Sequence, residues 1–133
     1  MQEGARYARQ IQVKQFGIQG QKTLNGSRAL IVGVGGLGCH VGLQLAGAGV
    51  GQITLIDHDT IDISNLHRQV LYRETDVGSS KVLIAQRELQ SLNSQISISA
   101  MNERLMPSNV SDLVNRADTV SYTHLTLPTT PYV

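Results

Sequence analysis

The hydrophobic positions along the chain form short apolar runs separated by longer amphipathic segments, a pattern that predicts strands alternating with helices. Residues 29–32 and 53–56 are β-branched and aliphatic, which is typical of strands buried on both faces of a parallel sheet. Between these runs, Val41, Leu45 and Ala48 recur at helical spacing, and the pattern ends at closely spaced glycines. The first half of the chain therefore predicts a strand, a helix and a second strand.

The second half of the chain continues this alternation. Apolar residues at helical spacing predict an amphipathic helix over residues 79–93, with a buried face formed by Val82, Ala85, Leu89 and Leu92. Residues 96–100 alternate between apolar side chains and serine, which predicts a third strand. A helix with Ser108 as its N-cap is expected over residues 107–116, and a fourth strand begins near Asp118.

Alternating strands and helices of this kind favour the α/β class. We expect a Rossmann-like, doubly wound and mainly parallel sheet with flanking helices, incomplete at its C-terminus. Ligands of such sheets bind at the carboxyl ends of the strands. The residues that follow each predicted strand are therefore the first candidates for a functional site.

Charge is distributed unevenly, although its sum is small. The 133 residues have a net charge of +1, which argues against a basic nucleic-acid-binding protein and gives no attraction to anionic membranes. Residues 29–56 carry no charge and are numerous enough to cross a bilayer, but Gly35, Gly36, His40 and Gln44 interrupt any continuous apolar helix. With one cysteine and no signal-peptide pattern, the protein is expected in the cytoplasm.

A glycine-rich motif follows the first predicted strand directly. Residues 33–38 read Gly-Val-Gly-Gly-Leu-Gly and match G-x-G-x-x-G. Such glycines let backbone N–H groups approach phosphate oxygens, and the helix that begins there directs its positive dipole end at an anion. Asp57 ends the second strand nineteen residues after the motif, where a carboxylate can accept hydrogen bonds from a ribose. A nucleotide is therefore expected to contact Gly33, Gly35, Gly36, Gly38 and Asp57.

Three further groups of polar residues flank this unit. They are Arg6-Tyr7-Ala8-Arg9-Gln10 before the first strand, Ser64-Asn65-Leu66-His67-Arg68-Gln69 after the second strand, and Lys81 at the start of the next helix. Together with the glycine motif and the Asp57-His58-Asp59 segment, they closely resemble the MoeB/ThiF family of adenylyltransferases, relatives of the ubiquitin-activating enzymes. The resemblance extends from Arg6 to about Val120.

In that family, ATP adenylates the C-terminal glycine carboxylate of a small ubiquitin-like sulfur-carrier protein, and pyrophosphate is released. The resemblance implies a carrier that ends in Gly-Gly, of the thiamine or molybdopterin type, with ATP and Mg²⁺ as cofactors. It implies that Arg9, Arg68 and Lys81 are catalytic and that Asn65 contacts the phosphates. It also implies a homodimer, in which Arg9 reaches the site of the neighbouring subunit. Fixed cations of this kind offset the charge that develops when a carboxylate attacks a phosphate.

Other functions remain open at this point. A related enzyme that activates a tRNA-bound carboxylate for dehydration, an NAD-binding Rossmann domain and a remnant without activity all contain the same glycine motif. The NAD alternative leaves Arg9 and the loop around Asn65 without a role.

The cysteine and the histidines are not expected to bind a metal. His40, His58, His67 and His124 lack metal-site spacing, and a single cysteine cannot form a Cys-x-x-Cys zinc site. Cys39 follows the glycine motif near a helix N-terminus that could lower its thiol pKa. We interpret it as a small, buried packing residue.

The end of the chain departs from the family pattern. Members of that family continue from the fourth strand into an acid-rich D-C-T-D-N segment that helps to bind Mg²⁺, whereas this sequence has Tyr-Thr-His-Leu-Thr at residues 122–126. We therefore expect residues 1–120 to be the N-terminal part of an ATP-binding domain. Residues 121–133 are interpreted as a foreign or artefactual tail, with an authentic divergent C-terminus as the alternative.

Overall fold

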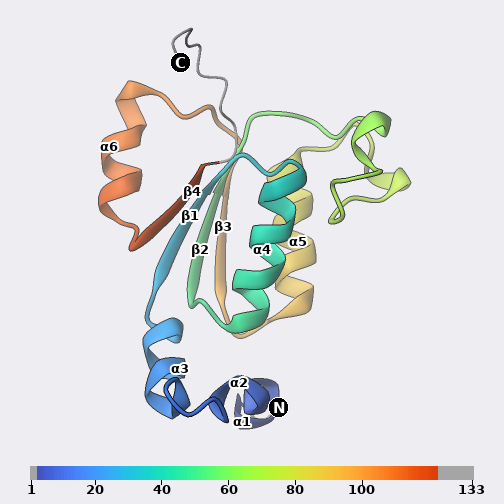
Figure 1. The fold of residues 1–133 in the computed structure, drawn as a ribbon. Coiled ribbons are helices and arrows are strands. Elements are labelled where there is room, and N and C mark those ends of the chain that lie inside the picture. The colour runs from blue at the N-terminus through green and yellow to red at the C-terminus, as the bar shows by residue number, and fades with distance from the viewer. Residues whose placement is uncertain (1–2, 123–133) are drawn as a thin grey trace, which may run out of the picture.

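A sheet of four parallel strands forms the centre of the computed structural model, which describes residues 3–122 (Figure 1). In spatial order, the strands are β3 (Ser97–Met101), β2 (Gln52–Ile56), β1 (Arg28–Val32) and β4 (Thr119–Tyr122). Each strand forms within one residue of its predicted position, and all three pairings are parallel.

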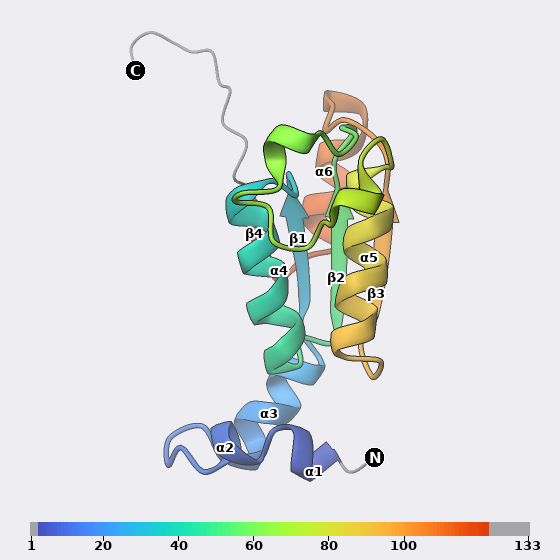
Figure 2. The same ribbon diagram turned by 90° about the vertical axis from the view of Figure 1, so that its right-hand side faces the viewer.

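Helices cover both faces of this sheet (Figures 1 and 2). α4 (Gly36–Ala48) and α5 (Lys81–Leu92) lie against one face, and α6 (Pro107–Asn115) lies against the other. This arrangement confirms the predicted α/β fold with its doubly wound parallel sheet. In the described part of the chain, no helix combines the length and the apolar composition that crossing a membrane requires.

The strands are apolar because side chains on both faces of the sheet are buried. On the face covered by α4 and α5, Ile31, Ile53 and Leu55 have no exposed surface. On the opposite face, Leu30 and Ile56 belong to a smaller core that includes Leu113 of α6. Burial on both faces explains why the strands read as continuous apolar runs.

α4 packs through small residues as well as through the predicted apolar stripe, of which Val41 and Leu45 contact the core. Cys39 and Gly42 are buried, whereas Val41 and Leu45 are only half-buried. A Cβ atom on Gly42 would lie 3.1 Å from Leu89 Cδ1 on α5, so this glycine permits the two helices to approach closely. Hydrophobic spacing does not reveal such a face because glycine contributes no apolar side chain.

Two details of the later helices differ from the prediction. Leu92, expected on the buried face of α5, is 43% exposed, although the other three predicted positions are buried. The prediction of Ser108 as an N-cap is wrong because α6 begins at Pro107, with Met106 at the N-cap. Proline suits the first helical position since it has no N–H to leave unpaired, and Asn109 Oδ1 accepts a 2.8 Å hydrogen bond from Met106 N.

Three short helices that the hydrophobic pattern does not predict precede the sheet. They are α1 (Glu3–Arg6), α2 (Ala8–Ile11) and α3 (Gly17–Asn25), at the end of the sheet where the strands begin (Figure 1). Gln10 Nε2 and Gln21 Nε2 donate to Ala48 O at the end of α4, over 2.8 and 3.0 Å. Tyr7 is buried, and its hydroxyl accepts a 2.9 Å hydrogen bond from Asn93 Nδ2. Polar contacts therefore attach these helices to the domain.

β4 lies beside β1, and the two strands begin at an ion pair. Arg28 N donates to Asp118 Oδ2 over 2.8 Å, and Arg28 Nη2 lies 3.2 Å from Asp118 Oδ1. β4 continues through Tyr122, two residues beyond the predicted domain boundary. The rest of the predicted tail, residues 123–133, lies outside the described residues, and its foreign origin stays a prediction.

Candidate functional site

The carboxyl ends of β1 and β4 mark the point where the connections of the sheet diverge. α4 follows β1 on one face, whereas α6 leads into β4 from the other face (Figure 1). Open α/β sheets bind their ligands at such a point. The glycine motif of residues 33–38 leaves the end of β1 there, and α4 begins within it.

The glycine loop requires close packing of its own backbone. Gly33 has a φ of 91°, in the left-handed region that favours glycine. A Cβ atom on Gly38 would lie 2.0 Å from Gly33 O, which excludes any side chain at that position. The structure therefore explains two of the four glycines by backbone geometry alone.

Two side chains fasten this loop to the domain. Asp57 Oδ2 accepts a 2.8 Å hydrogen bond from Val34 N, and Asp57 Oδ1 accepts one of 2.9 Å from Asp59 N. Tyr72 OH donates to Val34 O over 2.6 Å, and burial raises the pKa of this phenol. Asp57 thus positions the loop, while its predicted ribose contact stays a prediction. The sequence gives no signal that singles out Tyr72.

A cavity of about 350 Å³ opens beside the loop and gathers most of the predicted site. Its walls are formed by Gly33, Gly35, Gly36, Leu37, Asp57, Asp59, Asn65, Arg68, Gln69 and Lys81. Seven of the nine residues predicted to form the site are in this set. The two exceptions are Gly38, which is buried within α4, and Arg9.

The loop after β2 brings an amide and a cation to this cavity. Its short 3₁₀ turn, Ile63–Asn65, is capped by Asp62, whose carboxylate accepts from Ser64 N over 2.9 Å. These Ser64 hydrogen bonds lower the pKa of the Asp62 carboxyl. In return, Asp62 N donates to Asn65 Oδ1 over 2.8 Å, which leaves Asn65 Nδ2 as a donor for a ligand. The aliphatic part of Arg68 packs 3.6 Å from the place where a Cβ on Gly36 would lie.

Lys81 adds a buried cation. It begins α5, is 6% exposed, and its Nζ lies 3.9 Å from Asp59 Oδ2. Arg68 is exposed by comparison, and its Nη1 donates to Ser64 O over 3.3 Å. Two cations and the N-terminus of α4 beside one glycine loop form an arrangement that suits a polyphosphate.

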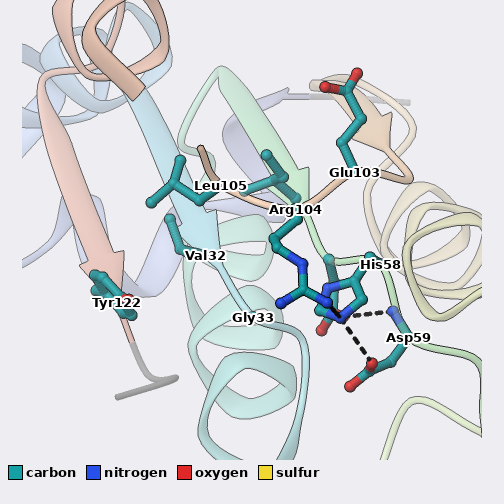
Figure 3. Close-up of a pocket in the computed structure, with 10 residues that line it drawn as sticks. Val32, Gly33, His58, Asp59, Glu103, Arg104, Leu105 and Tyr122 are labelled. Carbon is teal, nitrogen blue, oxygen red and sulfur yellow. Dashed lines mark hydrogen bonds and ion pairs between the residues drawn. The ribbon is translucent and has the colours of Figure 1, made fainter. Parts of the chain in front are cut away.

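A second cavity of about 210 Å³ adjoins the first (Figure 3). The two cavities share Gly33, Asp57 and Asp59, and the second also has apolar walls formed by Val32, Ile56, Leu105 and Tyr122. Figure 3 shows Arg104 extending toward His58, with Arg104 Nη2 3.1 Å from His58 Nε2. Sequence reasoning missed Arg104 because no motif spacing connects the loop after β3 to the glycine loop. Only the predicted parallel order of the strands places both loops at one edge.

The acidic residues between the cavities already contact protein groups. Asp57, His58 and Asp59 bring possible metal-ligand atoms within 4.8 Å of one another. However, both oxygens of Asp57 accept backbone hydrogen bonds, and His58 Nε2 contacts Arg104 and, at 3.4 Å, Asp59. The expectation that no histidine binds a metal stays a prediction, and His124 lies outside the described residues.

Cys39 is fully buried, and its Sγ donates to Val34 O over 3.6 Å. Burial raises the pKa of this thiol, so the helix N-terminus does not produce a thiolate at neutral pH. The structure confirms the predicted packing role.

Arg9 lies far from the cavities within one chain. It is exposed on α2, at the end of the sheet opposite the glycine loop (Figure 1). Its motif neighbours Tyr7 and Gln10 attach the N-terminal helices to the domain, whereas Arg9 lines neither of the two cavities. Its role in a second subunit stays a prediction.

The chain is similar to curated adenylyltransferases. The adenylyltransferase and sulfurtransferase MOCS3 of Culex quinquefasciatus is 47% identical over 118 residues, which are 89% of this chain and 27% of that protein. The molybdopterin-synthase adenylyltransferase of Salmonella typhimurium is 46% identical over 113 residues, 85% of this chain and 45% of that protein. The chain therefore spans less than half the length of these relatives.

A solved structure and a family comparison agree with this similarity. Escherichia coli MccB in complex with ATP is 39% identical, with a TM-score of 0.72 over 83% of this chain and 34% of that chain. The model of the ThiF family matches residues 7–124, which include the glycine loop, every residue that lines the first cavity, and Arg9. From its sequence and its fold, the chain belongs to the ThiF family.

Proposed function

We propose that this chain takes part in the ATP-dependent adenylation of the C-terminal glycine carboxylate of a small ubiquitin-like sulfur carrier. The observation that carries the proposal is the cavity in which the glycine loop meets Asn65, Arg68 and Lys81. Relatives named adenylyltransferases support it, and one of them is named for molybdopterin synthase. The proposed partner is a carrier of the molybdopterin or thiamine type that ends in Gly-Gly.

In this proposal, ATP spans the two adjoining cavities. The triphosphate occupies the first cavity, beside the N-terminus of α4 and the two cations. The ribose lies over Asp57, which both cavities share. The base enters the second cavity, where the apolar side chains of Val32, Ile56 and Leu105 and the ring of Tyr122 suit a planar ring, and Glu103 and Arg104 add polar groups (Figure 3).

The reaction exchanges one phosphorus–oxygen bond for another. A carboxylate oxygen of the carrier bonds to the α-phosphorus, the bond to the bridging oxygen breaks, and its electron pair leaves with pyrophosphate. Attacker and target are both anionic, and the leaving group gains charge. Arg68, Lys81 and the N–H groups at the start of α4 offset this charge, and the burial of Lys81 reduces its screening by water.

The described residues do not form a site for the expected Mg²⁺ by themselves. Asp57 and Asp59 are the carboxylates on the cavity wall. Asp57 accepts two backbone hydrogen bonds, and Asp59 faces His58 and Lys81. A Mg²⁺ site needs oxygen ligands that are free to complete an octahedron, and this set does not fit that need. Positive charge at the triphosphate therefore comes from Arg68 and Lys81 in this proposal.

Carrier-dependent exchange of pyrophosphate into ATP tests the proposed function, with the full-length protein. Arg68→Ala is expected to lower kcat by about a hundredfold or more, because it removes a cation that stabilises the transition state. The control is Arg116→Ala, since Arg116 is exposed and pairs with Asp112 on α6. Near-normal turnover of Arg68→Ala would refute its assigned role. A complete lack of exchange with Gly-Gly carriers would refute adenylation itself.

Dimerisation and location complete the proposal. Val13 and Ile18, near α2 and α3, are 53% and 64% exposed, and such apolar surface beside Arg9 suits contact with a second copy of the chain.

The protein is proposed to act in the cytoplasm. Adenylation is preferred to tRNA dehydration because the curated relatives are named adenylyltransferases, and preferred to NAD binding because NAD leaves Arg9 and the loop around Asn65 without a role. Tighter binding of NAD than of ATP would reverse the second preference.

A further inference from the structure

Gln69 carries a buried side-chain oxygen that receives no hydrogen bond from the described part of the chain. The residue is 3% exposed, and its Oε1 is buried without a donor among the described residues. Its backbone is satisfied, because Gln69 N donates to Asn65 O over 2.9 Å and Gln69 O accepts from Tyr72 N over 3.2 Å. Buried side-chain amides almost always have partners, so this one points to a group outside the chain.

The side chain of Gln69 lies on the wall of the first cavity, next to the glycine loop. Its Nε2 lies 3.6 Å from the place where a Cβ on Gly35 would be. The neighbouring Asn65, Arg68 and Lys81 all offer N–H donors to the same cavity. A triphosphate is satisfied by these donors, but it carries only acceptors and cannot supply a donor to Oε1.

A peptide group supplies the missing chemistry. The N–H of a peptide backbone is a hydrogen-bond donor of the kind that Oε1 lacks within residues 3–122. We propose that Gln69 binds the last peptide group of the carrier's Gly-Gly terminus and thereby holds the terminal carboxylate toward the α-phosphate, an inference that rests on the adenylation proposed above. Oε1 accepts from the N–H of the last glycine, the donor that the triphosphate cannot supply.

Thermal unfolding without ligands provides the first test. Gln69→Met keeps the shape of the side chain and removes both polar atoms, so Tm is expected to rise by a few degrees, because a buried side-chain oxygen without a hydrogen bond is destabilising. The matched control is Gln86→Met, which deletes a satisfied 2.7 Å hydrogen bond from Gln86 Nε2 to Ile98 O. The control is expected to lower Tm. A decrease for Gln69→Met as large as that of the control would show that the amide serves folding, and would overturn the proposal.

The second test removes the donor from the carrier. The probe is the carrier protein of Salmonella typhimurium molybdopterin synthase, made with or without a methyl group on its last peptide nitrogen, and assayed by pyrophosphate exchange with the full-length enzyme. Methylation and Gln69→Met are each expected to raise the KM for the carrier about tenfold. Combined, they should raise it no further, while the Kd for ATP changes less than twofold.

The possible outcomes distinguish a failure of the role proposed for Gln69 from a failure of the proposed adenylation. Gln69 does not bind the peptide group if methylation and Gln69→Met together raise the KM for the carrier by the product of their separate effects. The same conclusion follows if Gln69→Met raises the Kd for ATP and leaves the KM for the carrier unchanged. If the unchanged enzyme exchanges no pyrophosphate with the unmethylated carrier, adenylation fails and the role of Gln69 falls with it.

Discussion

Single glycine positions decide whether the loop after β1 can form. On α4, the place of a Cβ on Gly38 is taken by Gly33 O, 2.0 Å away. A Cβ on Gly47, in the last turn of the same helix, would meet no atom within 4 Å. Two glycines of one helix therefore have opposite requirements, one fixed by backbone contact and the other free to change.

Substituting alanine at these two positions tests this difference. Gly38→Ala is expected to lower the free energy of unfolding by about 1–3 kcal/mol and to weaken ATP binding, because the loop must move to relieve the contact. Gly47→Ala is expected to raise the free energy of unfolding by about 0.5–1 kcal/mol, since alanine favours the helix. Urea unfolding and ATP titration measure both quantities. Equal stability of the two variants would be inconsistent with the packing described.

At this scale, the sequence predicted the residues of motifs and missed the residues that act by contact. G-x-G-x-x-G indicated Gly38 because the pattern itself reflects close backbone approach. Tyr72, which lies outside every motif, bonds to Val34, 38 positions earlier. Gln69 ends the motif of residues 64–69, but the motif did not indicate its contact with the cavity. Contacts between such distant positions depend on the path of the chain, which no local pattern encodes.

Among the helices and strands, prediction succeeded where burial is strong and periodic. The four strands and the helix α5 follow from apolar patterns with clear spacing. α1, α2 and α3 are short and are attached by polar groups, such as Gln10 and Gln21 on Ala48 O, so hydrophobic spacing gives no signal for them. The place of β4 beside β1 likewise depends on a polar contact between Arg28 and Asp118.

The pairing of β4 with β1 is expected to depend on pH. Hydrogen bonds from the Arg28 side chain and backbone lower the pKa of the Asp118 carboxyl below its ordinary value of 3.8. A carboxyl with a lowered pKa in the folded state adds stability above its unfolded pKa, and that stability is lost as the pH falls through the folded pKa. Asp118→Asn should therefore be less stable than the unchanged protein at about pH 5–7, and the difference should shrink as the pH falls below about 4.

Urea unfolding across this pH range measures the effect. Asp112→Asn is the control, because Asp112 and Arg116 form an exposed pair four residues apart at the end of α6 that connects no strands. If the loss in the free energy of unfolding caused by Asp118→Asn stays constant as the pH falls below about 4, then the charge of the carboxylate is not its cause.

Across the whole molecule, topology brings the site together from distant segments. The loops after β1, β2 and β3 meet at one edge of the sheet and form the two adjoining cavities. The predicted parallel sheet, with ligands at the carboxyl ends of its strands, already implied this meeting, and seven of the nine predicted site residues line the first cavity. Arg9 is the exception that one chain cannot explain, because α2 lies at the other end of the sheet (Figure 1).

A mixture of two inactive variants tests whether Arg9 acts across a dimer. Arg9→Ala and Lys81→Ala are each expected to be inactive, because every site then lacks one cation. In a hybrid dimer, one site combines Lys81 of one chain with Arg9 of the other, so an equal mixture should regain about a quarter of normal pyrophosphate exchange. Lys81→Ala mixed with Arg68→Ala is the control, since both residues line the cavity of the same chain and no hybrid site is complete. Hybrid dimers that native mass spectrometry detects but that stay inactive would place the complete site within one chain and leave Arg9 outside it.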